Sequence, residues 1–142
     1  MLYRKIMNIF ITASKSAYHE VEKIKLILEA AGHNVTPPNG FDNPNAEEVT
    51  RNYSPEQYSD WKAQMIREDG RIVAKHDAVL VLNYEKNGQE NYIGGATFLE
   101  MFKAFDLGKK LFLYNPIPDG MLTDEIIGLQ PIVINQDLSL LQ

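Results

Sequence analysis

Cysteine is absent from this 142-residue chain, which excludes disulfide bonds and thiolate metal sites. Histidine is scarce, and His19, His33 and His76 lack the spacing of metal ligands, so we expect neither a zinc site nor another cofactor. Basic residues are scattered rather than clustered, and the net charge is −5. Duplex nucleic acid and anionic membranes are bound by basic faces. We therefore expect neither as a partner.

The segment MLYRKIMNIFITAS contains no long hydrophobic run. Its apolar stretch of about six residues is too short for the core of a secretory signal or for a membrane span. This favours a cytoplasmic protein. Hydrophobic residues make up 44% and charged residues 23% of the chain, as is usual for a soluble globular protein. The length favours a single domain over residues 1–142.

Short apolar segments alternate with amphipathic segments along the chain. The apolar segments predict strands at 7–12, 33–36, 78–83, 110–115 and 131–135. The amphipathic segments predict helices at 17–31, 55–75 and 96–107, with short helical pieces at 47–52 and 123–128. The polar stretch 37–55 is long for a connection within one domain, which favours a functional loop such as a lid.

Apolar strands separated by helices predict a parallel sheet that is covered on both faces. Right-handed crossovers leave few topologies. We expect an α/β, flavodoxin-like (Rossmann-like) three-layer sandwich with a five-stranded parallel sheet of order 2-1-3-4-5. In such sheets ligands bind beyond the carboxyl ends of the strands, where the strand order reverses. The loops after Thr12, Asn83 and Asn115 therefore carry the expected site.

The segment NYIGGATFLE follows one of these strand ends. Gly94 and Gly95 allow a close approach of the backbone to a ligand or a positive φ angle, although a glycine pair before a helix is often only a turn. Glu100 stands in a helix that is apolar on most sides, which predicts a buried carboxylate. Such an acid either points into the cleft or is structural, bonded to loop amides or to a lysine such as Lys109.

Several motifs together resemble those of the nucleoside 2-deoxyribosyltransferases, and equally those of their relatives, the deoxynucleoside 5′-monophosphate N-glycosidases. They are Asp69, the strand DAVLVLN that Asp77 opens, GGATFLE, and LGKKLFLYN. In that family a glycine-rich turn precedes a helix that carries the nucleophilic glutamate, which matches Glu100. A catalytic aspartate lies eight residues before the aspartate that opens the third strand, and this matches Asp69. The resemblance covers most of the chain.

The resemblance implies cleavage of the N-glycosidic bond of (deoxy)nucleosides or their 5′-monophosphates, by hydrolysis or by transfer to another base. Glu100 would be the nucleophile and Asp69 the acid or an orienting partner. The resemblance also implies a homodimer or larger homo-oligomer. The chain departs from the family at Phe10, where many members have tyrosine, at Phe102, where glycine is usual, and at Gly94, where Asp or Ser is frequent.

Other residues are candidates for contacts with a nucleoside or nucleotide. Ser14, Lys15 and Ser16 follow the first strand and suit a phosphate, although simple helix capping explains them equally well. The further candidates for substrate binding are Asn91, Gly94, Gly95, Thr97 and Asn115. The aromatic residues Phe41, Tyr53, Tyr58 and Trp61 are suited to stacking on a base, with Trp61 expected in the core. Asp77 is expected to anchor the entry to its strand.

Other interpretations remain open. Asp69, within REDGR, has the alternative of a solvated charge on a helix. The chain also fits a non-catalytic nucleotide-binding module of the same fold, because fold does not determine function. A third alternative is hydrolysis of a ribonucleotide or of a dinucleotide. A flavodoxin-like electron carrier is disfavoured, since the first loop lacks a run of Ser and Thr. A response regulator is disfavoured by the lack of an acidic pair at the end of the first strand.

Overall fold

The computed structural model describes residues 5–142, so the first four residues of the segment MLYRKIMNIFITAS lie outside the described part. A five-stranded parallel sheet of order β2-β1-β3-β4-β5 forms its centre. The strands are β1 (Asn8–Ala13), β2 (Asn34–Thr36), β3 (Ala78–Leu82), β4 (Lys110–Leu113) and β5 (Ile132–Val133). The predicted fold class and strand order are confirmed.

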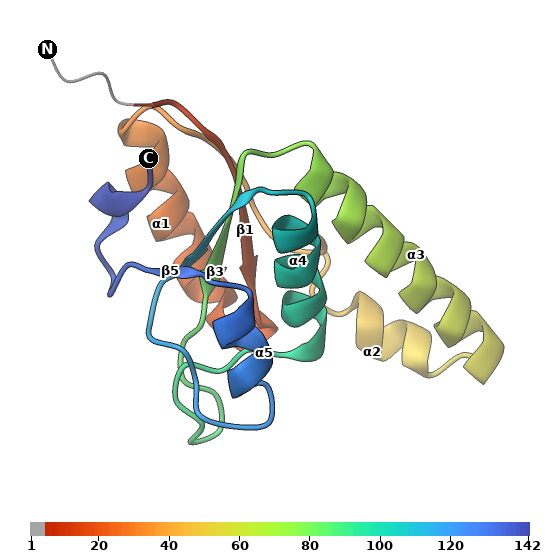
Figure 1. The fold of residues 1–142 in the computed structure, drawn as a ribbon. Helices are drawn as coiled ribbons and strands as arrows, with labels where there is room; N and C mark the ends of the chain where they lie inside the picture. The colour runs from red at the N-terminus through yellow and green to blue at the C-terminus, as the bar shows by residue number, and fades with distance from the viewer. Residues whose placement is uncertain (1–4) are drawn as a thin grey trace, which may run out of the picture.

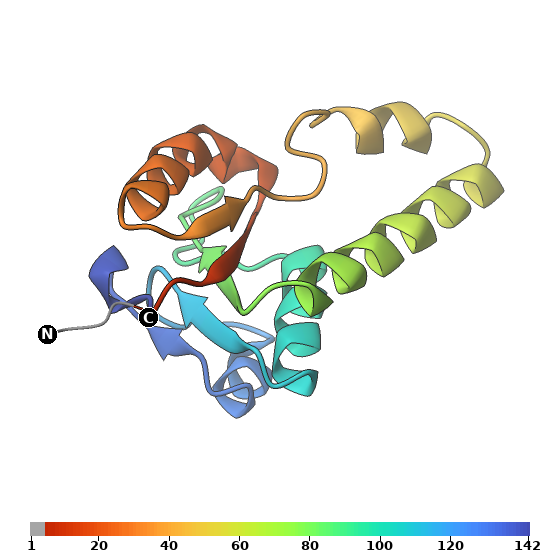
Figure 2. The same cartoon turned by 90° about the horizontal axis from the view of Figure 1, so that it is seen from above.

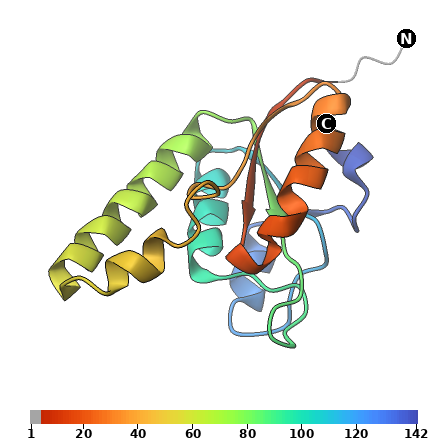
Figure 3. The same ribbon diagram turned by 180° about the vertical axis from the view of Figure 1, so that it is seen from behind.

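Helices cover the sheet on both faces. Helix α1 (Tyr18–Ala30) lies on one face, while α3 (Pro55–Ala74), α4 (Gly95–Asp106) and α5 (Thr123–Gly128) lie on the other (Figures 1 and 3). The remaining helices are short: α2 (Ala46–Arg51) within the long polar stretch, and the 3-10 turns η1 (Lys15–Ala17) and η2 (Leu138–Leu140). The three-layer arrangement follows from strands that are apolar on both sides.

The two core clusters alternate along the strands, as the period of a β-strand requires. Ile9 and Ile11 of β1 pack toward α1, whereas Phe10 belongs to the cluster that α4 and α5 complete. All five residues of β3 are buried. Asp77 accepts a hydrogen bond of 2.7 Å from the backbone nitrogen of Asn8. This confirms that Asp77 anchors the entry to its strand.

Helix α3 extends away from the sheet, with α2 beside its outer end (Figure 2). Residues 46–69 thus form a projecting arm. Helix α3 begins with a capping box formed by Ser54 and Gln57, and its only buried residue is Val73. The prediction of Trp61 as a core residue is therefore wrong: Trp61 is half-buried, since the arm has no second layer of protein over it.

Helix α4 also differs from the prediction. It is buried along the face that contains Thr97, Glu100, Met101 and Ala104. However, Leu99, Phe102 and Phe105 are each about half exposed, so the helix is not covered on most sides. An apolar sequence alone does not distinguish a helix in a core from one with an apolar face at the surface. None of the helices within residues 5–142 is long and apolar enough to cross a membrane.

Candidate active site

A cavity of about 1050 Å³ opens beyond the carboxyl ends of β1 and β3, at the predicted position in the sheet. It is bounded by the end of β1 and the loop after it, by the arm, by the start of α4, and by the loop 118–122 with the start of α5. Asp69 and Glu100, the two acids selected from the sequence, both line it. They come from the two neighbouring helices α3 and α4.

Glu100 is 7% exposed and is held from the end of β1. The hydroxyl of Thr12 donates a hydrogen bond of 2.7 Å to Oε1 of Glu100. Thr12 also lies 3.2 Å from the hydroxyl of Thr97. Because Thr12 has a single proton and gives it to Glu100, Thr97 is the donor in that second contact. The structural alternative in which Lys109 or loop amides pair with Glu100 is not observed.

The surroundings of Glu100 favour its protonated form. Burial, and secondly the charge of Asp69, raise its pKa to about 8, against the lowering effect of the bond from Thr12. A carboxyl group removed from water and facing a second acid holds its proton more tightly for both reasons. Around neutral pH Glu100 is therefore held mainly in its protonated form.

Asp69 is half-buried and faces the same cavity. Burial is the main cause that raises its pKa, while the amide of Asn39 and the charge of Lys62 oppose the rise. Asn39 donates a hydrogen bond of 2.8 Å to Oδ1 of Asp69. The nearby Arg71 pairs with Glu68 instead. Asp69 is thus oriented by Asn39 toward the cavity, rather than being a solvated charge of the helix.

The glycine pair forms the start of α4. Gly94 is the N-cap residue with φ −84°, and Gly95 is the first residue of the helix. Neither has a positive φ, so that part of the prediction is wrong. The cavity is lined by both glycines and by Thr97. A Cβ atom at Gly94 would lie 3.3 Å from the hydroxyl of Tyr92, a tight contact, so the packing of Tyr92 against this backbone accounts for glycine here. A Cβ atom at Gly95 would meet nothing within 4 Å.

The loop after β1 contributes Ser14 and Lys15 to the cavity, whereas Ser16 does not line it. The hydroxyls of Ser14 and Ser16 lie 3.1 Å apart and hydrogen-bond to each other. Neither η1 nor α1 has a side-chain cap, so the simple capping role is not observed. Lys15 forms an ion pair with Glu48 of α2, which connects this loop to the arm.

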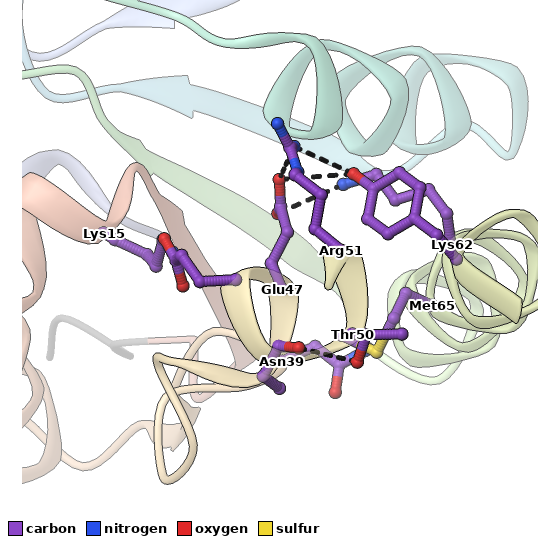
Figure 4. Close-up of polar contacts among 10 residues, drawn as sticks. Lys15, Asn39, Glu47, Thr50, Arg51, Lys62 and Met65 are labelled. Carbon is purple, nitrogen blue, oxygen red and sulfur yellow. Dashed lines mark hydrogen bonds and ion pairs between the residues drawn. The ribbon is translucent and has the colours of Figure 1, made fainter. Parts of the chain in front are cut away.

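The arm carries a cluster of charged side chains around Glu47 (Figure 4), which lines the cavity. Glu47 accepts hydrogen bonds from Arg51 at 2.6 Å and from Lys62 at 3.4 Å. Burial would raise the pKa of Glu47, but these two cations lower it overall. The rings of Tyr58 and Trp61 stack with centroids 6.0 Å apart. An aromatic surface with cations beside it suits a planar, electron-rich group such as a base.

Two asparagines predicted as substrate contacts do not line the cavity. Asn91 has a positive φ of 56° in the loop before α4. Asn115 donates to the carbonyl of Asn83 at 3.1 Å and accepts from Gln136 at 2.9 Å. In return, the side chain of Asn83 bonds the backbone of Asn115. Asn115 therefore joins the ends of β3 and β4, and its hydrogen-bonding groups are used in the fold.

Phe10 and Phe102, two of the positions at which the chain departs from the family's motifs, have different surroundings in the structure. Phe10 is fully buried in the core and brings no hydroxyl to the site. Thr12, two residues further along β1, supplies a hydroxyl to Glu100 instead. Phe102 is half exposed and lines a groove of about 570 Å³ between α3 and α4. The replacement at Phe102 thus changes the outer surface of α4.

Sequence reasoning did not select Thr12, Tyr18 or Asn39, although all three line the cavity. Thr12 carried a signal, since it is a hydroxyl residue at the end of an apolar strand and two residues from Phe10. Nothing in the sequence distinguishes Asn39 from the other polar residues of its loop. Within residues 5–142 no cluster of three acidic or histidine side chains is placed to hold a metal ion.

Comparison with known proteins supports the fold. The chain matches no protein-family model and no curated protein sequence. Among solved structures, it is similar to that of the Clostridium botulinum CMP N-glycosidase BcmB, with 18% sequence identity and a TM-score of 0.50. The similarity covers 89% of this chain and 84% of that one. At this identity, the two chains share an architecture.

Proposed function

We propose that this chain cleaves the N-glycosidic bond of a (deoxy)nucleoside or of its 5′-monophosphate and passes the sugar to water or to another base. The observation that carries the proposal is the acid pair, since Asp69 and Glu100 reach one cavity from two helices and interact electrostatically. The motif resemblance, and a fold like that of a CMP N-glycosidase, agree with this chemistry.

The proposed reaction has two steps. In the first, Asp69 gives its proton to a nitrogen of the departing base, the C1′–N bond breaks, and an oxygen of the Glu100 carboxylate bonds to C1′. In the second, water or another base attacks C1′ and gives a proton to Asp69, while Glu100 leaves. Positive charge develops on the sugar in both transition states, so a carboxylate beside C1′ stabilises them.

This mechanism requires one proton on the pair of acids. Burial and the charge of Asp69 hold the proton on Glu100 in the free protein, with a pKa of about 8. Substrate that places a basic nitrogen beside Asp69 draws the proton to that side and leaves Glu100 ionised. Above about pH 8 the pair has lost its proton and the base lacks a donor. We therefore expect activity to fall on the alkaline side.

The two ends of the cavity suit different parts of the substrate. The base lies against Trp61 and Tyr58 of the arm, near Asp69. The 5′ end lies toward Ser14 and Lys15, where a phosphate would meet a hydroxyl and an ammonium group. Ser16 supports this loop through its bond to Ser14. The start of α4, with its two glycines and Thr97, approaches the sugar.

A non-catalytic nucleotide-binding module is the second candidate. One observation favours it: Glu100 is held in its protonated form up to about pH 8. A neutral carboxyl group donates a hydrogen bond to a ribose hydroxyl without any chemistry. In that case the cavity would bind nucleotides and leave them intact.

We further propose a homodimer in which a second copy covers the exposed apolar face of α3 and α4. Ile66, Leu99, Phe102 and Leu107 line the groove between these helices, and each is at least two-fifths exposed. The groove is continuous with the cavity, since Asp69 and Glu100 line both. Burial of such a face in a second copy removes apolar area from water. Phe102→Asp should convert the dimer to a monomer in light scattering, whereas an unchanged mass would contradict this interface.

The test of the function is a chromatographic assay for free base. The protein is incubated with deoxynucleosides and deoxynucleoside monophosphates, with and without an acceptor base, beside a Glu100→Ala control. Base release that disappears in the variant supports glycosidic cleavage, and dependence on acceptor separates a transferase from a hydrolase. Binding of intact nucleotides with no base release supports the binding module.

A further inference from the structure

Tyr18, the first residue of α1, lines the cavity. The ring packs on the core cluster beneath α1 and lies against Phe41, with centroids 5.5 Å apart and an angle of 60° between the planes. Contacts on these sides fix the direction of the phenol. The sequence motifs did not point to Tyr18, and the mechanism above does not use it.

The hydroxyl of Tyr18 has no hydrogen-bond partner among residues 5–142, while every fully buried side-chain polar atom in this part of the chain has one. The phenolic oxygen is therefore not fully buried, and it belongs to a residue that lines the cavity. Three carboxylates act on it from three helices: Glu100 of α4, Asp69 of α3 and Glu47 of α2. Burial first, and then these charges, raise the pKa of Tyr18 to about 12. Tyr18 thus stays a neutral hydrogen-bond donor wherever the acid pair works.

We propose that Tyr18 is a substrate-contacting residue that donates its phenolic hydrogen bond to a hydroxyl group of the bound sugar, across the cavity from the acid pair. The inference rests on the proposed function. A sugar hydroxyl suits this position because it accepts from one side and donates from the other. It accepts from Tyr18 and gives its own proton to a carboxylate oxygen of the acid pair. A group without a hydroxyl would leave both neighbours without a partner.

The contact selects for hydroxylated sugars and orients the sugar ring above Glu100. Removal of one neutral hydrogen bond reduces binding by a modest factor, about 3- to 10-fold. The loss should appear in kcat/KM and depend on the substrate having the hydroxyl in question. A structural role for Tyr18 would instead reduce activity on all substrates alike.

The test is a double-mutant cycle in which one change removes the Tyr18 hydroxyl and the other removes a hydroxyl group of the substrate. kcat/KM for base release is measured for the wild type and Tyr18→Phe, with a 2′-deoxynucleoside and with its analogues that lack the 3′- or the 5′-hydroxyl. Tyr18→Phe keeps the ring and its packing on Phe41. The expected result is a loss of about 3- to 10-fold on the full substrate that disappears for one of the analogues. Tyr53→Phe, at an exposed tyrosine outside the cavity lining, is the matched control and should be silent.

Two outcomes overturn the inference while leaving glycosidic cleavage in place. These are unchanged kcat/KM in Tyr18→Phe, or an equal loss on all three substrates. If the wild type releases no base, the same substrates are titrated by calorimetry against wild type and Tyr18→Phe. Weaker binding of the hydroxylated sugar alone then upholds the contact and rejects the catalytic function. Equal binding in both proteins, or no binding at all, rejects the contact.

Discussion

The two helical sides of the cavity are built by different means. On the sheet side, Glu100 is buried on α4, which packs against the strands, and its carboxyl group is fixed by Thr12 of β1. On the arm side, α3 has one buried residue, and the side chains are held by exposed ion pairs such as Glu47 with Arg51. Exposed pairs stabilise weakly. The comparison teaches that the proposed nucleophile is placed on the rigid side, while the proposed proton donor Asp69 and the exposed ion pairs lie on the arm.

The largest effect on activity should come from a substitution of Glu100, on the rigid side of the cavity. Glu100→Gln removes the nucleophile and should reduce base release by about 10³-fold or more. The same change should stabilise the fold in alkali. The folded pKa of Glu100 is about 8 against an ordinary 4.5, so the wild type loses stability as pH rises through this window. The shift corresponds to a contribution on the order of 5 kcal/mol at full ionisation.

Thermal unfolding at pH 5 and pH 9 tests whether ionisation of Glu100 destabilises the fold. The midpoint of Glu100→Gln should exceed that of the wild type by more at pH 9 than at pH 5. An equal difference at both values would show that Glu100 is not held protonated by the fold.

Asp69→Asn tests the contact between the two sides. It removes the proton donor to the base and should lower kcat by about 10²-fold. Because the alkaline fall reflects loss of the proton that Asp69 donates, it should disappear in a variant that has no such donor. Loss of the Asp69 charge should also lower the pKa of Glu100, although burial, the larger cause, still raises it. A pH profile of kcat/KM that keeps its alkaline fall in this variant would contradict a shared proton.

Thr12→Val should have a smaller effect of about 10-fold, because it keeps the shape of the side chain and removes the hydroxyl. The bond from Thr12 lowers the pKa of Glu100. Its loss therefore raises that pKa further, and the alkaline limb of the profile should move to higher pH. A limb that stays in place, or moves to lower pH, would mean that Glu100 does not control it.

Trp61→Ala addresses the arm and should have the smallest effect on chemistry. Loss of stacking weakens base binding by about 10-fold in KM with little change in kcat. Trp61 is only half-buried, so the free energy of unfolding should change little. A large fall in kcat with unchanged KM would instead give Trp61 a role in the chemical step.

The sequence was sufficient to predict the architecture of the sheet. Strand periodicity and spacing predicted the sheet order, and the position of Glu100 after a glycine turn predicted an acid at the sheet edge. These features are local or follow from general rules of chain connection. The anchoring role of Asp77 was predicted for the same reason, since it stands at the start of a buried strand.

Other features depend on contacts that no local pattern encodes. Asn115 was expected in the site, but its side chain joins two strand ends. Tyr18 and Asn39 line the cavity because loops distant in the sequence come together there. The exposed side of α4 resembles a core face in its composition, since Phe102 fits a buried face and an interface equally well. Tertiary packing decides each of these cases.

Intact-mass spectrometry during turnover tests the central claim most directly. The wild type is mixed with a substrate that releases base, quenched in acid, and compared with Glu100→Gln treated in the same way. The account predicts a mass increase equal to one sugar moiety, located on the peptide that contains Glu100 and absent from the variant. Base release by the wild type with no adduct, and undiminished release by Glu100→Gln, would contradict it.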